Sequence, residues 1–204
     1  MAKDPLHFET LRGPAVHPVL PALARLRIAV FREWPYLYQG DEAHEAEYLR
    51  AYAEAPGAAV ILCRDGDTPV GAATCEPMAE THAEVRGSFT AAGLDPAQYC
   101  YFGESVLLPG YRGQGAGVRF FELREAHARL LGARFATFCA VQRAADDPRR
   151  PAGYTPLDGF WRRRGYESCP GLACTLSWRE PGGTADIPHR LGFWRKALTG
   201  GEAP

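Results

Sequence analysis

One stretch, Tyr101 to Leu131, constrains the fold most strongly, because it combines a strand, a glycine-rich loop and a helix. Residues 101–108 form an apolar, β-prone run that ends at Pro109-Gly110, and apolar residues recur at helical spacing after the loop. The loop itself, Arg112 to Gly117, contains three glycines. Glycines let the backbone approach a ligand, and a helix start leaves N–H groups unpaired at the positive end of its dipole. The stretch therefore predicts an anion cradle that fits a pyrophosphate.

Length and composition limit the possible classes of protein. A chain of 204 residues suits one domain that buries about 70% of its unfolded surface. We expect that domain over residues 1–180 and a C-terminal tail over residues 181–204. A net charge of −1 argues against nucleic acid or an anionic membrane as partner. The six cysteines include no C-x-x-C pair, and no apolar run approaches the roughly 18 residues of a membrane span, so we expect reduced thiols in a cytoplasmic protein.

The first half of the chain predicts a strand, two helices and a hairpin. The expected elements are a strand at His7 to Leu11, helices at Val19 to Phe31 and Glu42 to Ala55, and paired strands at Ala58 to Cys63 and Thr68 to Glu76. The hairpin prediction depends on the turn signal Asp65-Gly66. Aromatic residues gather in the link between the two helices, where we take Trp34 and Tyr38 as candidates for substrate contact. The alternative is that these rings pack against a neighbouring helix.

The second half predicts helices and strands in alternation, followed by the tail. The expected elements are a helix at Ala79 to Ala92, the strand, loop and helix described above, a strand at Arg134 to Val141, an exposed and mobile loop at Gln142 to Tyr154, a helix capped by Thr155 and ending at Gly165, strands at Tyr166 to Cys169 and Leu172 to Trp178, and a short tail helix near His189 to Leu198. This order predicts the α/β class, as an α+β mixed sheet with helices on its faces.

Two motifs carry a family resemblance. Residues Leu107 to Gly117 follow the pattern V-x-P-x-(Y)-R-G-x-G-x-G, which includes R/Q-x-x-G-x-G/A, and Phe160 to Tyr166 joins an aromatic pair, a basic stretch and Gly-Tyr. In these motifs the chain resembles the GNAT superfamily of acyl-CoA-dependent N-acyltransferases, over most of Phe8 to Trp178. Other nucleotide-binding motifs fit poorly, because a P-loop needs Gly-Lys-Ser/Thr and Val118 stands where a dinucleotide motif has its third glycine. The resemblance implies a central, mostly antiparallel sheet with splayed fourth and fifth strands and helices on both faces.

The resemblance also implies acetyl-CoA as co-substrate. Backbone N–H groups of the glycine loop would hold the pyrophosphate, with Arg112 adding charge, and the strand before the loop would offer backbone groups to the pantetheine arm. An N–H of Val106 or Leu107 would stabilise the oxyanion of the thioester carbonyl. The residues that the resemblance assigns to the cofactor are Val106, Leu107, Leu108, Arg112, Gly113, Gln114, Gly115, Ala116 and Gly117.

The implied chemistry is attack of a primary amine on the thioester, which a base that removes the amine's proton would assist. Glu104 is the candidate base, because a carboxylate in the apolar run Phe102 to Val106 needs a reason to be present. The alternative is that Glu104 faces solvent or pairs with an arginine such as Arg134. Family members commonly use a tyrosine of the late helix as acid, but Trp161 stands at that position, so Tyr154 is the candidate acid, with a packing role as its alternative.

We therefore predict an N-acetyltransferase that moves an acetyl group from acetyl-CoA to a small-molecule or peptide amine. The alternative is a non-catalytic acyl-CoA-binding or sensing domain. His82 and His127 have no second ligand at metal spacing, so we predict no metal site. A further alternative is that the chain forms a homodimer through its tail.

Overall fold

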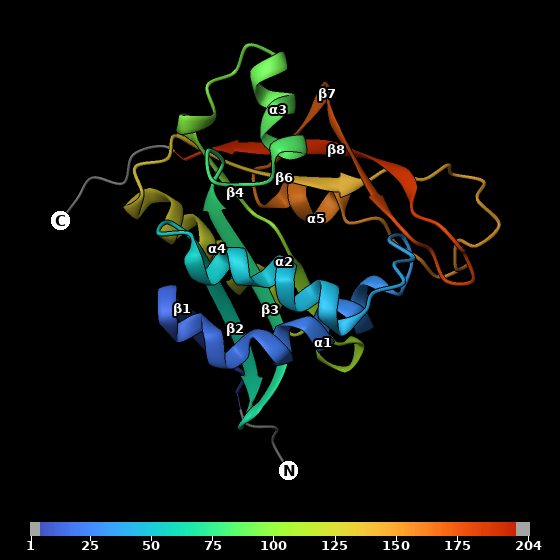
Figure 1. Ribbon diagram of the computed structural model, residues 1–204, viewed down its shortest axis with the longest axis horizontal. Coiled ribbons are helices and arrows are strands. Elements are labelled where there is room, and N and C mark those ends of the chain that lie inside the picture. Colours follow the sequence, from blue (N-terminus) through green and yellow to red (C-terminus); the bar gives the residue numbers. More distant parts are fainter. Residues whose placement is uncertain (1–4, 199–204) are drawn as a thin grey trace.

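The computed structural model describes residues 5–198 and contains, within that range, one eight-stranded sheet flanked by helices (Figure 1). The strands are β1 (His7–Leu11), β2 (Ala59–Asp65), β3 (Thr68–Pro77), β4 (Tyr99–Tyr101), β5 (Ser105–Leu107), β6 (Phe135–Val141), β7 (Glu167–Trp178) and β8 (Ile187–Ala197). The α-helices are α1 (Leu20–Phe31), α2 (Glu42–Glu54), α3 (Ala83–Ala91), α4 (Ala116–Leu130) and α5 (Asp158–Arg163). Short 3₁₀ turns are η1 (Gly13–Val19), η2 (Pro96–Gln98) and η3 (Pro109–Tyr111).

The sheet has the strand order β1-β2-β3-β4-β6-β8-β7, and β5 also pairs with β3. The β4–β6 pair is parallel, and the other pairs are antiparallel. The predicted hairpin is confirmed, because β2 and β3 are joined by a turn in which Gly66 has a φ of +55°. The predicted mixed, mostly antiparallel sheet is confirmed as well.

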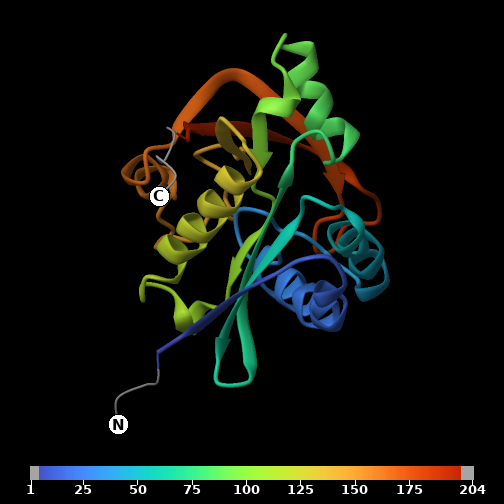
Figure 2. The ribbon, with the colours of Figure 1, turned by 90° about the vertical axis from the view of Figure 1, so that its left-hand side faces the viewer.

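Helices cover both faces of the sheet, as Figure 2 shows for α4 on one side of β2 and β3 and for α1 and α2 on the other. Alternation along β2 explains this arrangement. Ala59 and Ile61 belong to the core under α4, while Val60 and Leu62 belong to the core under α1 and α2. In residues 5–198 no helix is long and apolar enough to span a membrane.

Local capping chemistry sets the helix boundaries near the site. The side chain of Asp41 caps α2 by accepting hydrogen bonds from the N–H groups of Ala43 and His44. The cap predicted for α5 is wrong: the helix begins at Asp158 and its N-cap is Leu157, not Thr155. The predicted Ala79–Ala92 helix is shorter at both ends and forms α3.

The tail helix predicted near His189 to Leu198 is also wrong, because these residues form most of β8. This strand lies in the interior of the sheet, between β6 and β7. Leu191, Phe193 and Trp194 are buried. The C-terminal segment is therefore a structural part of the sheet as far as Ala197, one residue before the described residues end.

Candidate functional site

The sheet opens where β4 gives way to β5. The N–H of Phe102 still donates to β6, at Thr137 O (2.7 Å), whereas the N–H of Gly103 donates to β3, at Thr74 O (3.1 Å). From Gly103 onward the chain follows β3 alone, and β6 continues along β8. The strand predicted over residues 101–108 is thus broken: β4 stays paired with β6, and β5 separates from it, as the resemblance implied.

The register with β3 decides which backbone groups face the opening. Glu104 O accepts from the N–H of Thr74 (3.0 Å), and the N–H of Leu108 donates to Val70 O (3.0 Å). Antiparallel pairing alternates, so Glu104, Val106 and Leu108 direct their backbone groups toward β3. Ser105 and Leu107 direct theirs away from β3, into the opening. Val106 and Leu108 are therefore poor candidates for cofactor contact through the backbone, and Ser105 is a candidate that the sequence did not reveal.

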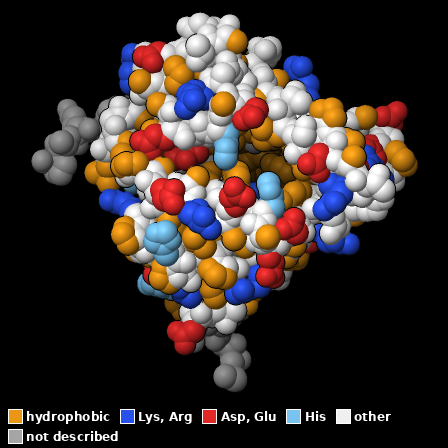
Figure 3. All heavy atoms as spheres, viewed as in Figure 1, with side chains coloured by type: hydrophobic (Ala, Val, Ile, Leu, Met, Phe, Trp, Pro, Cys, Tyr) orange, Lys and Arg blue, Asp and Glu red, His pale blue; other side chains and the backbone are white. Residues whose placement is uncertain are grey.

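A groove of about 1750 Å³ occupies this opening, and apolar side chains dominate its lining. Figure 3 shows the molecule hollowed between α2 and the strands β6 to β8, with hydrophobic side chains inside. The lining comes from the end of α1 and the link after it, from β5, from the glycine loop, from β6 and from the segment before α5.

The glycine loop forms one end of the groove. Gly113 and Gly115 have φ values of +76° and +87°, which side chains rarely tolerate, and Gly115 is the N-cap of α4. Within the described chain, the backbone N–H groups of residues 113–118 have no protein acceptor. Six successive unpaired donors at a helix N-terminus fit a pyrophosphate.

Two other loop residues have roles that the motif did not reveal. The Arg112 guanidinium donates to Leu107 O (3.1 Å) and to the Glu33 carboxylate (2.9 Å), so part of its charge is already balanced. A Cβ on Gly117 would lie 3.3 Å from the ring of Phe160, so the absence of a side chain there lets α5 pack against α4.

Glu104 lies beneath the break and does not line the groove. Its carboxylate accepts hydrogen bonds from Arg27, from the Thr74 hydroxyl and from the Tyr48 hydroxyl (2.8 Å for the last). Burial by itself would raise the pKa of this carboxyl, but the Arg27 charge and the two hydroxyl groups outweigh burial and lower the pKa below its usual range. A buried carboxylate with these partners is a poor proton acceptor, so the structure does not support Glu104 as the base.

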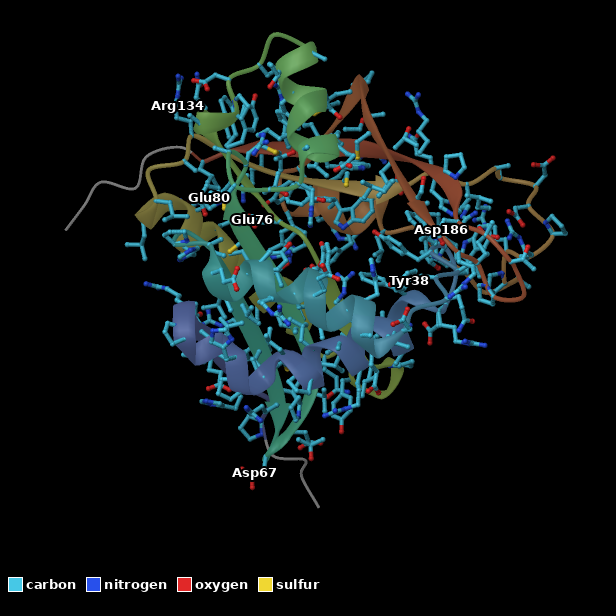
Figure 4. The ribbon with its side chains drawn as sticks, in the orientation of Figure 1. Tyr38, Asp67, Glu76, Glu80, Arg134 and Asp186 are labelled. Atoms are coloured by element: carbon cyan, nitrogen blue, oxygen red, sulfur yellow. The ribbon has the colours of Figure 1, made fainter. Side chains whose placement is uncertain are left out.

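The alternative prediction, that Glu104 pairs with an arginine, is confirmed, but the partner is not Arg134. Arg134 lies at the outer end of β6 and donates to Gln98 (Figure 4). Arg27 bridges Glu104 and Glu45 instead, and all three side chains are buried. The signal was present in the sequence, because Arg27 falls on the apolar side of its helix.

The aromatic candidates separate into two groups. Trp34 and Tyr154 both line the groove, with their rings in edge contact at 6.1 Å between centroids. Burial raises the pKa of Tyr154, so its phenol stays protonated at neutral pH. Tyr38 is not among the lining residues in the described chain. It lies at the loop that joins α1 and α2 (Figure 4), whereas Tyr36 of the same loop lines the groove.

Trp161 is part of the groove wall. Its ring contacts Phe138 and Trp194, each at 5.1 Å between centroids. It therefore supports the packing of α5 against β6, and its indole cannot serve as an acid.

The loop after β6 is anchored by a half-buried ion pair. Arg143 donates to the carbonyl oxygens of Pro35 and Tyr36 (2.8 Å each) and to the Glu180 carboxylate (2.6 Å). Arg149 also pairs with Glu180. Most of the loop is exposed, as predicted, but one arginine near its start ties the α1–α2 link to the β7–β8 turn.

Comparison with known proteins agrees with this geometry. The sequence model of the Acetyltransferase (GNAT) family matches residues 23–152, well over half of the chain. The chain therefore belongs to the GNAT acetyltransferase family. No curated protein sequence matches it.

Three solved structures illustrate the likeness in fold. A putative GNAT acetyltransferase from Desulfovibrio desulfuricans is 14% identical with a TM-score of 0.57, covering 96% of this chain and 100% of its own. A putative acetyltransferase from Salmonella typhimurium, solved with its cofactor acetyl-CoA, is 12% identical with a TM-score of 0.58, covering 98% and 97%. A ribosomal-protein-alanine N-acetyltransferase from Brucella melitensis is 16% identical with a TM-score of 0.60, covering 93% and 99%. At these identities the likeness supports the fold alone.

Proposed function

We propose that this chain transfers an acetyl group from acetyl-CoA to a primary amine within a ternary complex. One observation carries the proposal: four residues of the loop with unpaired N–H groups line the same groove as Ser105 and Leu107, whose backbone groups face away from β3. The four are Gly113, Gly115, Gly117 and Val118. An anion cradle and a row of strand donors, side by side, match a cofactor with a pyrophosphate and an amide-containing arm.

The residues of the groove support a direct transfer. Acetyl-CoA would place its pyrophosphate on the glycine loop and its arm along β5. The amine nitrogen attacks the carbonyl carbon, the carbonyl oxygen gains charge beside the N–H of Ser105 or Leu107, and the C–S bond breaks as the carbonyl re-forms. The amine loses a proton and the sulfur gains one.

The structure limits which groups handle these protons. Glu104 is enclosed by its partners, so the amine proton leaves through water in the groove. Tyr154 is the candidate acid for the sulfur, because its phenol lines the groove and is protonated. Trp34 and Tyr36 supply aromatic surface for the acceptor, a small molecule or a peptide.

A second candidate function is acyl-CoA binding without transfer. The observation in its favour is Trp161, an indole at the position where the sequence motif leads us to expect an acid.

Release of the CoA thiol tests the proposal. The purified protein is incubated with acetyl-CoA and a panel of small amines, amino acids and peptides, and CoA binding is measured by calorimetry. We expect amine-dependent thiol release together with an acetylated product. Tight CoA binding without release for any amine would favour the second function, and absence of CoA binding would reject both.

A further inference from the structure

Arg124 is a buried cation directly behind the break in the sheet. It is 1% exposed and lies on the side of α4 that packs against β3 and β5. Its guanidinium carbon lies 4.5 Å from the ring centroid of Phe102 and 4.9 Å from that of Phe121. Within the described residues, no carboxylate forms an ion pair with it. Burying a charge is expensive, so a buried arginine without an acidic partner needs an explanation.

The hydrogen bonds of Arg124 all go to backbone carbonyl oxygens. Nε donates to Phe120 O (3.2 Å), and Nη1 donates to Glu104 O (3.2 Å) and Thr74 O (3.5 Å). Two of these oxygens already have a backbone donor: Thr74 N–H for Glu104 O, and Gly103 N–H for Thr74 O. The backbone is thus satisfied without Arg124, and what the side chain adds is positive charge at the Glu104 carbonyl.

That carbonyl belongs to the same peptide group as the N–H of Ser105. In a planar trans peptide the C=O and N–H point in opposite directions. The oxygen points to β3 and Arg124, so the N–H points into the groove, which Ser105 lines. A cation bonded to the carbonyl end polarises the group and strengthens the N–H as a donor, most effectively in a site of low dielectric.

We propose that Arg124 is a positioning residue that holds and polarises the Glu104–Ser105 peptide, so that the Ser105 N–H is the donor to the thioester oxygen. This inference rests on the proposed function and names the donor within that site. In the transfer step, the C–N bond forms as the carbonyl electron pair moves to the oxygen facing Ser105. The pair returns as the C–S bond breaks, the amine nitrogen loses a proton to water in the groove, and the sulfur takes a proton. Arg124 neither gains nor loses a proton.

The test separates this role from a purely structural one. Arg124→Met removes the charge from a site that apolar rings already surround, and Arg124→Lys keeps the charge but loses the planar fork. Arg119→Met is the matched control, because Arg119 is on the same helix, is exposed and pairs with Glu122. The measurements are kcat, KM for acetyl-CoA, melting temperature, and the infrared carbonyl band of bound carbonyl-labelled acetyl-CoA without acceptor.

For Arg124→Met we expect kcat to fall roughly 10- to 100-fold, somewhat less than the loss of a whole oxyanion donor. KM for acetyl-CoA stays within about twofold, because pyrophosphate binding does not involve Arg124. The melting temperature stays equal or rises. The carbonyl band, displaced to lower frequency in the wild type, moves back toward its position in free acetyl-CoA. For Arg124→Lys we expect a kcat and a carbonyl band between those of Arg124→Met and the wild type. Arg119→Met should match the wild type.

An unchanged kcat and carbonyl band in Arg124→Met would overturn the inference and leave the proposed function standing. A lower melting temperature with an unchanged carbonyl band in the folded fraction would also overturn the inference, because Arg124 would then be structural. If the methionine variant does not fold, the lysine variant decides on the same two readouts. If the wild type binds acetyl-CoA but transfers nothing, the proposed function fails, and the carbonyl band still tests the role of Arg124.

Discussion

Glu104 has no unoccupied side facing the groove. Arg27, Thr74 and Tyr48 surround its carboxylate, and its own N–H donates to the Thr74 hydroxyl (2.9 Å). These bonds connect α1, α2 and β3 at the point where the sheet opens. These contacts favour a structural role for the carboxylate at the opening of the sheet over a role as base.

Glu104→Gln is expected to lower the free energy of unfolding by about 3 kcal/mol, because it leaves Arg27 buried with one carboxylate fewer. Urea denaturation at pH 7 measures this change. Glu9→Gln, which breaks the half-exposed pair with Arg64, is the control and should change stability by less than about 1 kcal/mol. A loss of activity in Glu104→Gln without a loss of stability would instead support Glu104 as a base.

The same residue gives a dependence on pH. Folding lowers the pKa of Glu104, so the stability that it contributes is complete above its ordinary value of 4.5 and is lost as the pH falls through the lower folded value. The difference between wild type and Glu104→Gln should accordingly shrink below about pH 4.

Glu76 behaves in the opposite way. Burial raises its pKa to about 7, and the neighbouring Glu104 and Glu80 add to the rise. The contribution of a group with a raised pKa is complete below 4.5 and is lost as the pH rises through 7. Glu76→Gln should therefore be more stable than wild type at pH 8, by about 3 kcal/mol, but not at pH 4. Urea unfolding at both pH values measures this, with the exposed Glu84→Gln as control. Equal curves at pH 8 would show that Glu76 titrates normally.

At the residue scale, sequence reasoning singled out Glu104 but found neither its partners nor the buried arginines. Glu104 attracted notice as a carboxylate in an apolar strand, and Arg27 fell on an apolar helix side. Their pairing joins residues 77 positions apart, which depends on how α1 packs over β5. Arg124 stands on an apolar helix side in the same way, four residues after Phe120. Helical periodicity indicates that such a charge is buried, but not what it contacts.

At the element scale, the glycine loop and α4 act as one anion-binding unit. Gly115→Val is expected to weaken CoA binding by at least about tenfold. Among residues 5–198, nothing beyond the adjacent backbone lies within 4 Å of a Cβ there, so the valine side chain would occupy the space in front of the loop's N–H groups. Gly132→Val is a matched control. Gly132 also has a positive φ (+74°) and open space, but it follows the other end of α4. Both variants lose about 1–2 kcal/mol to backbone strain.

Calorimetric titration with CoA compares the two glycine variants. Loss of affinity in Gly115→Val alone supports the loop as the pyrophosphate site. Equal CoA affinities of the two variants would indicate that the pyrophosphate binds elsewhere in the groove.

Elements with local signals were predicted well, and elements with remote partners were not. The β2–β3 hairpin and the loop and helix around Gly115 depend on neighbouring residues, so their signals are visible in the sequence. For β8, the Gly/Pro-rich segment before it resembled the start of a tail. Side chains of β8 are buried at every second position, at His189, Leu191 and Phe193. This alternation is typical of a strand, and it depends on the position of β8 between β6 and β7.

At the scale of the whole molecule, the site depends on the topology of the sheet. The parallel β4–β6 pair ends at Tyr101, β5 stays with β3, and the groove fills the space that this separation leaves. The family resemblance predicted the separation. The pairing register, which directs the backbone groups of Ser105 and Leu107 into the groove, follows only from the three-dimensional structure. The ion pair between Arg143 and Glu180 then fixes the far wall of the groove.

The position of acetyl-CoA in a crystal structure of the complex tests the central claim most directly. The pyrophosphate should accept hydrogen bonds from N–H groups of residues 113–118, and the thioester oxygen should lie about 3 Å from the nitrogen of Ser105 or Leu107. A thioester placed away from both nitrogens, or a pyrophosphate bound outside the glycine loop, would contradict the account.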